Sequence, residues 1–361
     1  MMVRDLLDVL AESWSTAIDL FCNTQTKTSS MFSTSTRQYQ ILHSLGEGGF
    51  SHVVLVKDQA SGGEHFAAKK MLCHRGMDTY AMAQREMDAY RRFHHHRNII
   101  TMLDSVVFDD DVVGRSNSKA VYMVFPVYRR GNLLDLVMHN QEGEEAGGSR
   151  FLDELFIIGV FRGICDAVSY LHSYADTDEH EQQGYAPLQA TADDSSSRPV
   201  TPYAHRDIKL ANVMLADDGQ TPILMDFGSC LPARFTAHTR QDALRIQDDA
   251  AESCSMAYRA PELFDVQTGA EFDERTDVWS LGCLLFALAY SHTPFEEPLL
   301  QGGLAGTSSI LLAAINRKYS FPASNPYSPR LKQIIDFMLE PDPKRRPFVD
   351  QVIALTRALY P

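Results

Sequence analysis

The sequence predicts an α+β fold in which a small β-rich part with one main helix precedes a larger α-rich part. Four runs rich in β-branched and aromatic residues are bounded by turn residues and predict strands, and a helical run at 78–93 separates the third from the fourth. From Leu133 onward the periodicity is mainly helical. This separation of strands from helices along the chain is typical of an α+β protein. The four strands are expected at 39–45, 53–57, 66–72 and 121–125.

The first coherent element along the chain is an amphipathic helix at 3–21. Its polar face is more acidic than basic, so it lacks the cationic surface of a membrane-binding helix. Docking onto the protein itself or onto a partner helix is therefore favoured. Palmitoylation of Cys22 would instead make residues 3–22 a peripheral membrane contact. The apolar stripe, with alternating spacings of four and three, consists of Val3, Leu7, Leu10, Trp14, Ala17 and Phe21.

We expect three parts in the chain. An N-terminal helix and Ser/Thr-rich linker occupy 1–37, the β-rich lobe occupies 38–126 and the α-rich lobe occupies 127–361. Within the last part, 174–202 holds six acids, one arginine and few large apolar residues, which predicts an acidic, Ser-rich, flexible surface insert. Shorter loops are expected at 141–149 and 301–309.

Composition limits the class of protein and its partners. With 361 residues, 44% of them hydrophobic, the chain can bury a large core. Its net charge of −14 argues against nucleic acid or an anionic membrane as a partner of the whole surface, but leaves a local basic groove possible. The six scattered cysteines contain no Cys-x-x-Cys pair, which favours reduced cytosolic thiols over a disulfide frame or zinc site.

The longest apolar run, 281–290, is too short for a membrane span and predicts a buried helix. Because the N-terminus lacks a secretory signal, we expect a cytoplasmic protein.

A glycine-rich segment follows the first predicted strand. Its sequence, Gly-Glu-Gly-Gly-Phe-Ser-His-Val at 46–53, contains small residues that let backbone N–H groups approach the phosphates of ATP closely. Ser51 stands where the pattern G-x-G-x-x-G has its third glycine, so the segment alone also fits a plain β-hairpin. Val53 is expected to cover the adenine together with Ala67. The predicted phosphate-binding residues are Gly46, Glu47, Gly48, Gly49, Phe50 and Ser51.

Lys69 is the predicted partner of the ATP phosphates. It lies in an Ala-Ala-Lys context on the third predicted strand, and Glu86 follows 17 residues later on the predicted helix. An ion pair between them would hold the ammonium group on the α- and β-phosphates. Lys70 competes for this role, but side-chain alternation along a strand cannot turn both lysines inward. Without the other motifs, a lone lysine would be interpreted as a solvated surface charge.

The segment His-Arg-Asp-Ile-Lys at 205–209 carries the predicted catalytic groups. Asp207 would orient the acceptor hydroxyl and take its proton, and Lys209 would balance charge on the transferred phosphoryl group. Asn212 and Asp226, the latter in Asp-Phe-Gly, offer the oxygen ligands that Mg²⁺ binds. An isolated Asp-x-x-x-x-Asn is usually a loop or a helix cap. The order of the motifs and the 19-residue gap between the two aspartates favour the catalytic interpretation.

Two structural motifs accompany these groups. Glu262, in Ala-Pro-Glu, is expected to pair with Arg346, and Asp277 is expected to start a buried helix that anchors the catalytic loop. With these motifs, residues 39–359 resemble the eukaryotic protein kinase domain. Details such as Leu-Gly-Glu-Gly-Gly-Phe-Ser and Tyr-Arg-Ala-Pro-Glu-Leu-Phe are similar to the Numb-associated kinase family, and within it to the serine/threonine-protein kinase 16 type.

The resemblance implies a bilobal protein kinase fold and a non-specific serine/threonine protein kinase that uses ATP and Mg²⁺, phosphorylates proteins and autophosphorylates. Lys209, two residues after Asp207, supports the Ser/Thr specificity. The resemblance also implies that Ser255 contacts both of these residues and that 241–252 forms a helix. A pseudokinase-like interaction scaffold is the alternative. It is disfavoured because none of the catalytic or metal-binding residues is lost.

The resemblance assigns three further cofactor-binding residues. Phe125 falls at the gatekeeper position, where a large side chain narrows the back of the ATP pocket, although plain core packing also fits this residue. The other two are Tyr128, in the hinge, and Met214.

The N-terminus departs from the animal members of the family, which are myristoylated on a glycine after the initiator methionine. This chain begins Met-Met-Val, so that anchor is not expected. The fungal vacuole-associated type relies on N-terminal palmitoylation, for which Cys22 is available. We therefore expect a cytoplasmic protein and leave open a peripheral attachment to a Golgi, endosomal or vacuolar membrane.

Overall fold

The computed structural model describes most of the chain from residue 31 onward. The predicted helix at 3–21, Cys22, most of the insert at 174–202, and the loop residues Gly48, Gly49 and Phe50 lie outside the described residues. The described segments are 31–47, 51–60, 62–73, 79–110, 118–145, 151–175, 200–296, 307–323 and 326–361.

The chain divides into two compact units, which we call the sheet unit and the helical unit. The sheet unit comprises Met1–Leu152 and Ala211–Gly228, and the helical unit comprises Asp153–Leu210 and Ser229–Pro361. Each unit holds a separate cluster of the predicted functional residues.

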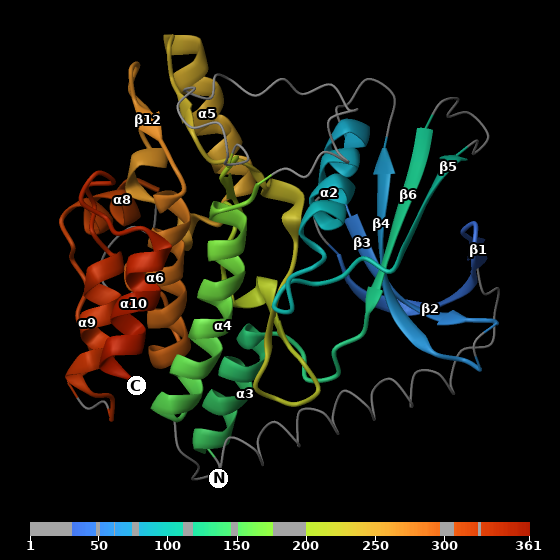
Figure 1. The fold of residues 1–361 in the computed structure, drawn as a ribbon, viewed down its shortest axis with the longest axis horizontal. Helices are drawn as coiled ribbons and strands as arrows, with labels where there is room; N and C mark the ends of the chain where they lie inside the picture. Colours follow the sequence, from blue (N-terminus) through green and yellow to red (C-terminus); the bar gives the residue numbers. More distant parts are fainter. Residues whose placement is uncertain are drawn as a thin grey trace. The chain divides into compact units, whose positions relative to one another are not determined.

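The sheet unit is built on a six-stranded antiparallel sheet with the order β1-β2-β3-β4-β6-β5 (Figure 1). Side chains alternate between its two faces. Ala68 joins a buried aromatic and aliphatic cluster on one face, and the next residue, Lys69, points to the other. Helix α2 covers this second face, where Tyr90 packs on Phe125. The elements are β1 (Met31–Ser33), β2 (Gln38–Glu47), β3 (Ser51–Asp58), β4 (His65–Cys73), α2 (Thr79–Phe93), β5 (Asp104–Asp110) and β6 (Ser118–Pro126).

A two-stranded hairpin completes the sheet unit. Strand β8 (Val213–Leu215) pairs antiparallel with β9 (Pro222–Leu224), and helix α3 (Leu133–Glu145) lies against β8. The hairpin begins directly after Asn212 and ends two residues before Asp226. It therefore sets the positions of both predicted metal ligands.

The helical unit is organised around α6, whose residues from Asp277 to Tyr290 are all buried. This confirms the buried helix predicted at 281–290. Helices α4 and α9 pack on α6, and α10 packs on both α4 and α9. The helices are α4 (Glu154–His172), α5 (Arg240–Ser253), α6 (Arg275–Tyr290), α8 (Thr307–Ile315), α9 (Pro329–Met338) and α10 (Val349–Leu359). Short antiparallel pairs join β7 (Tyr203–Ala204) to β10 (Leu231–Pro232) and β11 (Phe235–Thr236) to β12 (Glu271–Phe272), and 3-10 turns span Met256–Tyr258 and Pro261–Leu263. Two further 3-10 turns, Leu210–Asn212 and Phe227–Ser229, fall at the points along the chain where one unit ends and the other begins.

Among the described residues, α4 is long and apolar enough to cross a membrane by length and composition alone. From the sequence we expect no apolar stretch long enough to span a membrane. Of its apolar window, 61% is buried inside the protein, and Asp153 caps its first turn by accepting the N–H of Phe156. We therefore interpret α4 as a core helix of the helical unit.

The structure confirms the four predicted strands and the predicted helix at 78–93, but it corrects three other expectations and adds a strand, β5. The linker expected up to residue 37 contains β1, and β5 was not predicted at all. Both are edge strands, and their polar and acidic residues weaken the pattern of a strand. The loop expected at 141–149 is helical as far as Glu145, and the loop expected at 301–309 gives way to α8 at Thr307.

Candidate active site

Lys69 is the centre of an ion-pair network in the sheet unit. Its Nζ lies 2.6 Å from Oε1 of Glu86 on α2 and 2.9 Å from Oδ1 of Asp226. The neighbouring Lys70 points to the opposite face, where its ammonium group lies over the ring of Tyr122. The predicted ion pair is thus present, and it is made by Lys69, not by Lys70.

Burial and neighbouring charges shift the pKa values of this network in opposite directions. Burial lowers the pKa of Lys69, but the carboxylates of Glu86 and Asp226 outweigh it and raise that pKa above its ordinary value. Glu86 is only 2% exposed, and burial raises its pKa while the ammonium group opposes the change. The ammonium of Lys69 therefore stays charged at neutral pH.

Asp226 is directed toward Lys69 by the residue that follows it. Phe227 is buried beneath α2, with its ring 5.4 Å from that of Tyr90 and 5.7 Å from that of Phe93. The backbone of Asp226 has a φ of +65°, a left-handed conformation that few non-glycine residues adopt. The anchored phenylalanine holds the aspartate in this unfavourable conformation.

Asn212 and Asp226 lie near the same end of the β8–β9 hairpin. Val213 is paired with Leu224, and the N–H of Met225 donates to the carbonyl of Asn212 at 2.9 Å. The two side chains offer an amide oxygen and a carboxylate, which are the hard oxygen ligands that Mg²⁺ prefers. This donor set fits a magnesium ion completed by phosphate oxygens and water. Within the described residues there is no cluster of three or more His, Cys, Asp or Glu that would form an all-protein metal cage.

Strand register places the predicted adenine-binding residues on one face of the sheet. Val53 is opposite Lys69, and Ala67 is opposite Phe125. Because Ala67 and Lys69 are two residues apart on β4, all four side chains share the face that α2 covers. Phe125 is buried against Tyr90 at a ring distance of 4.8 Å.

The remaining predicted nucleotide residues also belong to the sheet unit. Gly46 and Glu47 end β2, and Ser51 begins β3. Met214 is half-buried on β8 and forms an isolated antiparallel bridge with Asn132. Tyr128 is also half-buried, and burial raises the pKa of its phenol.

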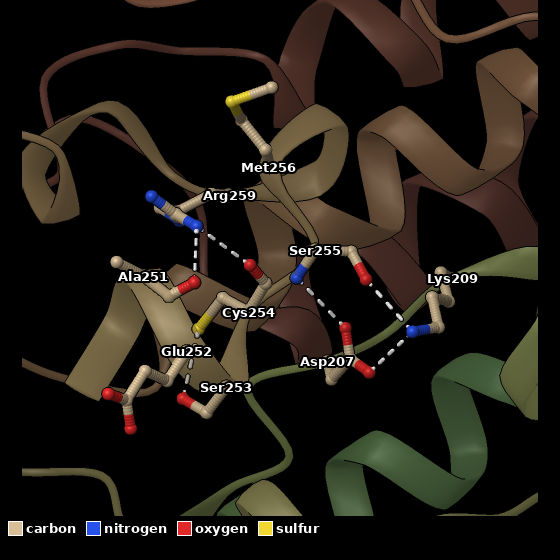
Figure 2. Close-up of a pocket in the computed structure, with 9 residues that line it drawn as sticks. All are labelled: Asp207, Lys209, Ala251, Glu252, Ser253, Cys254, Ser255, Met256 and Arg259. Carbon is tan, nitrogen blue, oxygen red and sulfur yellow. Dashed lines mark hydrogen bonds and ion pairs between the residues drawn. The ribbon is translucent and has the colours of Figure 1, made fainter. Parts of the chain in front are cut away.

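Asp207 holds a second cluster, which lies within the helical unit (Figure 2). Its Oδ1 accepts the backbone N–H of Ser255 at 3.0 Å, and its Oδ2 accepts a hydrogen bond from Lys209 at 2.8 Å. The same ammonium group donates to the hydroxyl of Ser255 at 2.9 Å. The predicted contacts of Ser255 are therefore confirmed. A cavity of about 490 Å³ opens beside this cluster, lined by Asp207, Lys209, Ala251, Glu252, Ser253, Cys254, Ser255, Met256 and Arg259.

Asp277 fixes the backbone of the catalytic loop, as expected. Its Oδ2 accepts the N–H of His205 at 2.7 Å and its Oδ1 accepts the N–H of Arg206 at 2.9 Å. Arg206 has a φ of +70°, so this turn needs such support. His172 of α4 donates from Nε2 to Oδ2 of Asp277 at 3.0 Å. Burial alone would raise the pKa of Asp277, but these hydrogen bonds and nearby histidines hold it below its usual range.

The predicted helix at 241–252 is confirmed by α5. Thr239 and Asp242 form a reciprocal capping box at its start. At its end, the guanidinium of Arg259 donates to the carbonyl of Cys254 at 2.9 Å and to that of Ala251 at 3.3 Å. Arg259 thus fastens the end of the helix, which forms one wall of the cavity beside Asp207 (Figure 2).

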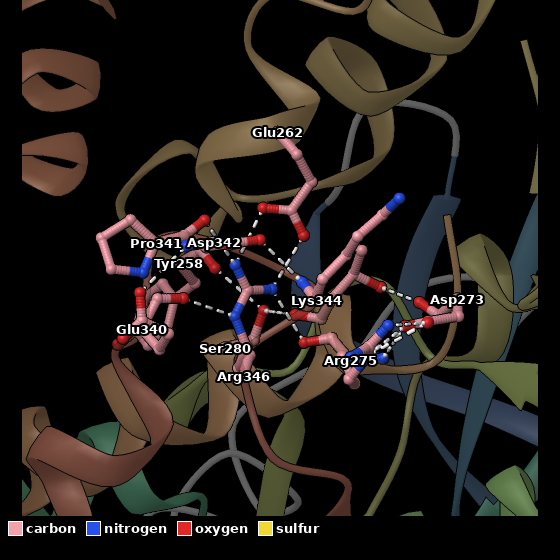
Figure 3. Close-up of polar contacts among 11 residues, drawn as sticks. Tyr258, Glu262, Asp273, Arg275, Ser280, Glu340, Pro341, Asp342, Lys344 and Arg346 are labelled. Atoms are coloured by element: carbon pink, nitrogen blue, oxygen red, sulfur yellow. Dashed lines mark hydrogen bonds and ion pairs between the residues drawn. The ribbon is translucent and has the colours of Figure 1, made fainter. Parts of the chain in front are cut away.

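The predicted pair of Glu262 and Arg346 is also present (Figure 3). The two carboxylate oxygens accept separate hydrogen bonds, at 2.7 Å and 2.9 Å, from the two terminal nitrogens of the guanidinium. Arg346 donates further to the carbonyls of Arg275 and Glu340 and lies over the ring of Trp279. Such bidentate pairing is the strong form of a salt bridge.

The comparison with known proteins agrees with this arrangement. A family model described as the protein kinase domain matches residues 39–175 and 201–356. The chain belongs to the protein kinase family. The β-rich sheet unit and the helical unit confirm the expected α+β protein kinase fold.

Several named kinases are similar to this chain over nearly its whole length. Serine/threonine-protein kinase ppk13 of Schizosaccharomyces pombe is 32% identical over 88% of this chain and 89% of its own. Serine/threonine-protein kinase 16 of Homo sapiens is 33% identical, with 90% of this chain and 91% of its own covered. Serine/threonine-protein kinase ENV7 of Saccharomyces cerevisiae is 28% identical, with 90% and 92% covered. The resemblance to the serine/threonine-protein kinase 16 type is thereby confirmed.

Sequence reasoning missed two residues that position the catalytic cluster. His172 supports Asp277 from another helix, and Arg259 fastens the wall of the cavity. His172 gave no signal, because its partner lies 105 residues away. Arg259 was visible in the Tyr-Arg-Ala-Pro-Glu segment, but its partners are backbone carbonyls that no sequence pattern marks.

Proposed function

We propose that this protein is an active serine/threonine protein kinase that transfers the γ-phosphoryl group of ATP to Ser and Thr hydroxyls of proteins, including its own. The observation that carries the proposal is the pairing of Asp207 with Lys209 and Ser255 in one unit, together with the pairing of Lys69 with Glu86 and Asp226 in the other. Phosphoryl transfer needs both sets of groups to act on one reaction. A relative named for Ser/Thr specificity covers nine-tenths of the chain.

Each residue has a distinct part in the proposed mechanism. Lys69, held by Glu86, binds the α- and β-phosphates and orients ATP. Asp207 accepts the proton of the acceptor hydroxyl as that oxygen attacks the γ-phosphorus, and Lys209 stabilises the negative charge of the transferred group. Asn212 and Asp226 would hold Mg²⁺, which supplies neutralisation of phosphate charge when bound.

The adenine is proposed to bind against the face of the sheet that carries Val53, Ala67 and Phe125. The half-buried Tyr128 and Met214 belong to the same unit and are proposed as further contacts. These aliphatic and aromatic side chains offer the apolar surface that a purine ring requires, while Gly46, Glu47 and Ser51 flank the predicted phosphate-covering loop.

Two points of the proposal rest on the sequence alone. Residues 3–22, with Cys22, are proposed as a peripheral membrane contact on a Golgi, endosomal or vacuolar membrane, and the rest of the protein is proposed to be cytoplasmic. A pseudokinase scaffold is the rival function. The intact ion pairs of Lys69 and Asp207 disfavour it.

Phosphoryl transfer from labelled ATP with Mg²⁺ tests the proposal. The acceptors are the protein itself and a generic Ser/Thr substrate, and phosphoamino-acid analysis identifies the modified hydroxyls. We expect label on Ser and Thr that disappears in both Asp207→Asn and Asp226→Ala. Tight Mg·ATP binding by a folded protein that transfers no phosphate would instead favour the scaffold.

A further inference from the structure

Strand β1 covers the face of the sheet opposite α2. In the strand order β1 and β5 are the two edges of the sheet, yet Phe32 of β1 stacks on Tyr122 of β6 with a centroid distance of 4.3 Å. Phe32 also stacks on Tyr39 and is 6% exposed. The sheet is therefore strongly curled, so that its edge strand β1 approaches the opposite edge, formed by β6 and β5. Figure 1 shows β1 near β5, at the end of the long, curved β2. We call residues 31–37 the strap.

The hydroxyl of Thr34 holds the polar end of the strap. It donates to Oδ2 of Asp104, the first residue of β5, at 2.5 Å. It also accepts the backbone N–H groups of Thr36 and Arg37, at 3.3 Å and 3.0 Å, and so closes the turn between β1 and β2. The hydroxyl of Thr36 donates to the same carboxylate oxygen at 3.1 Å. One carboxylate on β5 thus fastens the strap through two hydroxyls.

The charges around this turn are predominantly negative. Arg37 is 3.4 Å from Asp58 and lies over the ring of Phe66, so its guanidinium already has partners. Asp104, Asp58 and Arg37 are the charged groups that act on Tyr39, which packs beneath the strap. Burial and the carboxylate of Asp104 raise the pKa of Tyr39 to about 12. The turn therefore holds two carboxylates and one cation.

We propose that Thr34 is a phosphorylation site and that phosphoryl transfer to its hydroxyl releases the strap from the sheet. The inference rests on the proposed function, because a second copy of this kinase supplies the phosphoryl group from ATP. In that transfer Oγ of Thr34 attacks the γ-phosphorus and forms a new O–P bond. The bond from phosphorus to the β–γ bridging oxygen breaks, ADP leaves, and the hydroxyl proton passes to Asp207 of the second copy.

A phosphate on Thr34 would break the contact between the strap and Asp104 for two reasons. It removes the hydroxyl hydrogen that Asp104 accepts, and it adds a charge of about −2 at hydrogen-bond distance from that carboxylate. Among the described residues, Arg37 is the cation that acts on Tyr39 beneath the turn, and Asp58 competes for it. Thr36 cannot compensate, because its hydroxyl depends on the same oxygen of Asp104.

The test uses the full chain incubated with Mg·ATP, with Asp207→Asn as the unmodified control. Mass spectrometry maps the phosphate, and hydrogen exchange follows the backbone amides of the strap and of Tyr39. We expect phosphate on Thr34 and exchange at least about tenfold faster, since repulsion between like charges at this range exceeds the free energy of a tenfold change. Ser35→Ala, a neighbouring hydroxyl on the exposed side of the turn, should leave both results unchanged.

Asp104→Asn tests whether charge repulsion between the phosphate and Asp104 releases the strap, or whether the contact is merely structural. The asparagine side chain has no charge to repel the phosphate, and its amide N–H can donate to a phosphate oxygen, so in the phosphorylated protein this variant should regain most of the slow exchange. Phosphorylation of a generic substrate without phosphate on Thr34 would overturn the inference and leave the proposed function standing. Phosphate on Thr34 without faster exchange would also overturn it. Absence of transfer to any acceptor would remove the proposed function, and the inference with it.

Discussion

At the scale of single residues, Lys69 depends on two carboxylates from separate parts of the chain. Glu86 comes from α2 and Asp226 from the segment after β9, and both contacts are shorter than 3 Å. The lysine cannot be removed without leaving the buried Glu86 as an uncompensated charge. Its substitution therefore affects both the chemistry and the local structure.

Lys69→Met should reduce kcat by about 10²–10³-fold, the range seen when one charge-stabilising donor is removed from an active site. Glu86→Gln keeps the shape of the partner and removes its charge, so it should produce a smaller loss of the same kind. Steady-state kinetics with varied ATP measure both effects. Equal kcat for wild type and Lys69→Met would show that this lysine has no part in the transfer.

Inhibitor binding tests whether Phe125 is the gatekeeper residue at the back of the ATP pocket. Because its ring is buried against Tyr90, we expect the wild type to bind poorly to inhibitors that extend a bulky group behind the adenine. Phe125→Ala should improve their binding and lower the free energy of unfolding by about 3–5 kcal/mol, as for other buried aromatic truncations. Inhibitor titration and urea denaturation measure the two effects. Tight binding of such an inhibitor to the wild type would contradict the assignment.

At the scale of elements, Arg346 ties the segment before α10 to the Pro261–Leu263 turn and to the start of α6. Its side chain is fully buried and makes a bidentate pair with Glu262. The neighbouring Arg345 is 72% exposed, and its ion pair with Glu340 is 3.5 Å long. The two adjacent arginines therefore offer a matched comparison of a buried and an exposed pair.

Arg346→Ala should lower the free energy of unfolding by about 3–5 kcal/mol, because it leaves the carboxylate of Glu262 partly buried without its partner. Arg345→Ala should change it by less than about 1 kcal/mol, as expected for an exposed ion pair. Urea midpoints at constant m-value give both numbers. Similar losses in the two variants would mean that burial does not decide the strength of these pairs.

At the scale of the whole molecule, the catalytic loop links stability to pH through Asp277. Its pKa lies below the ordinary value of 3.8 in the folded state, so the unfolded chain binds more protons as the pH falls past that value. The resulting stabilisation is complete above about pH 5 and is lost as the pH falls through the folded pKa. The melting temperature should therefore fall more steeply between about pH 5 and pH 3 in the wild type than in Asp277→Asn. Parallel slopes would show that this carboxylate does not contribute.

Residue types and spacing were sufficient to predict most of the fold and of the site. Strand alternation allowed only one of Lys69 and Lys70 to point inward, and Glu86 was the partner expected for Lys69 from the kinase motifs. The pairs of Glu262 with Arg346 and of Ser255 with Asp207 followed from the family resemblance. All of these contacts are present in the structure.

The remaining features could not be predicted because they depend on contacts between distant segments. Asp104 belongs to an edge strand with acidic ends, and only the curled sheet brings it to Thr34, 70 residues earlier. His172 reaches Asp277 because α4 packs on α6. Neither contact leaves a periodic pattern in the sequence, so both are visible only in the three-dimensional structure.

The central claim is that Asp207 performs the proton transfer of a serine/threonine kinase. The most direct measurement compares Asp207→Asn with the wild type in two assays on one preparation, Mg·ATP affinity and the rate of phosphate transfer to a Ser/Thr substrate. We predict an ATP dissociation constant within about threefold of the wild type and a loss of at least about 10²-fold in rate, as expected when a general base is removed. A variant that binds ATP and transfers phosphate at the wild-type rate would contradict the account.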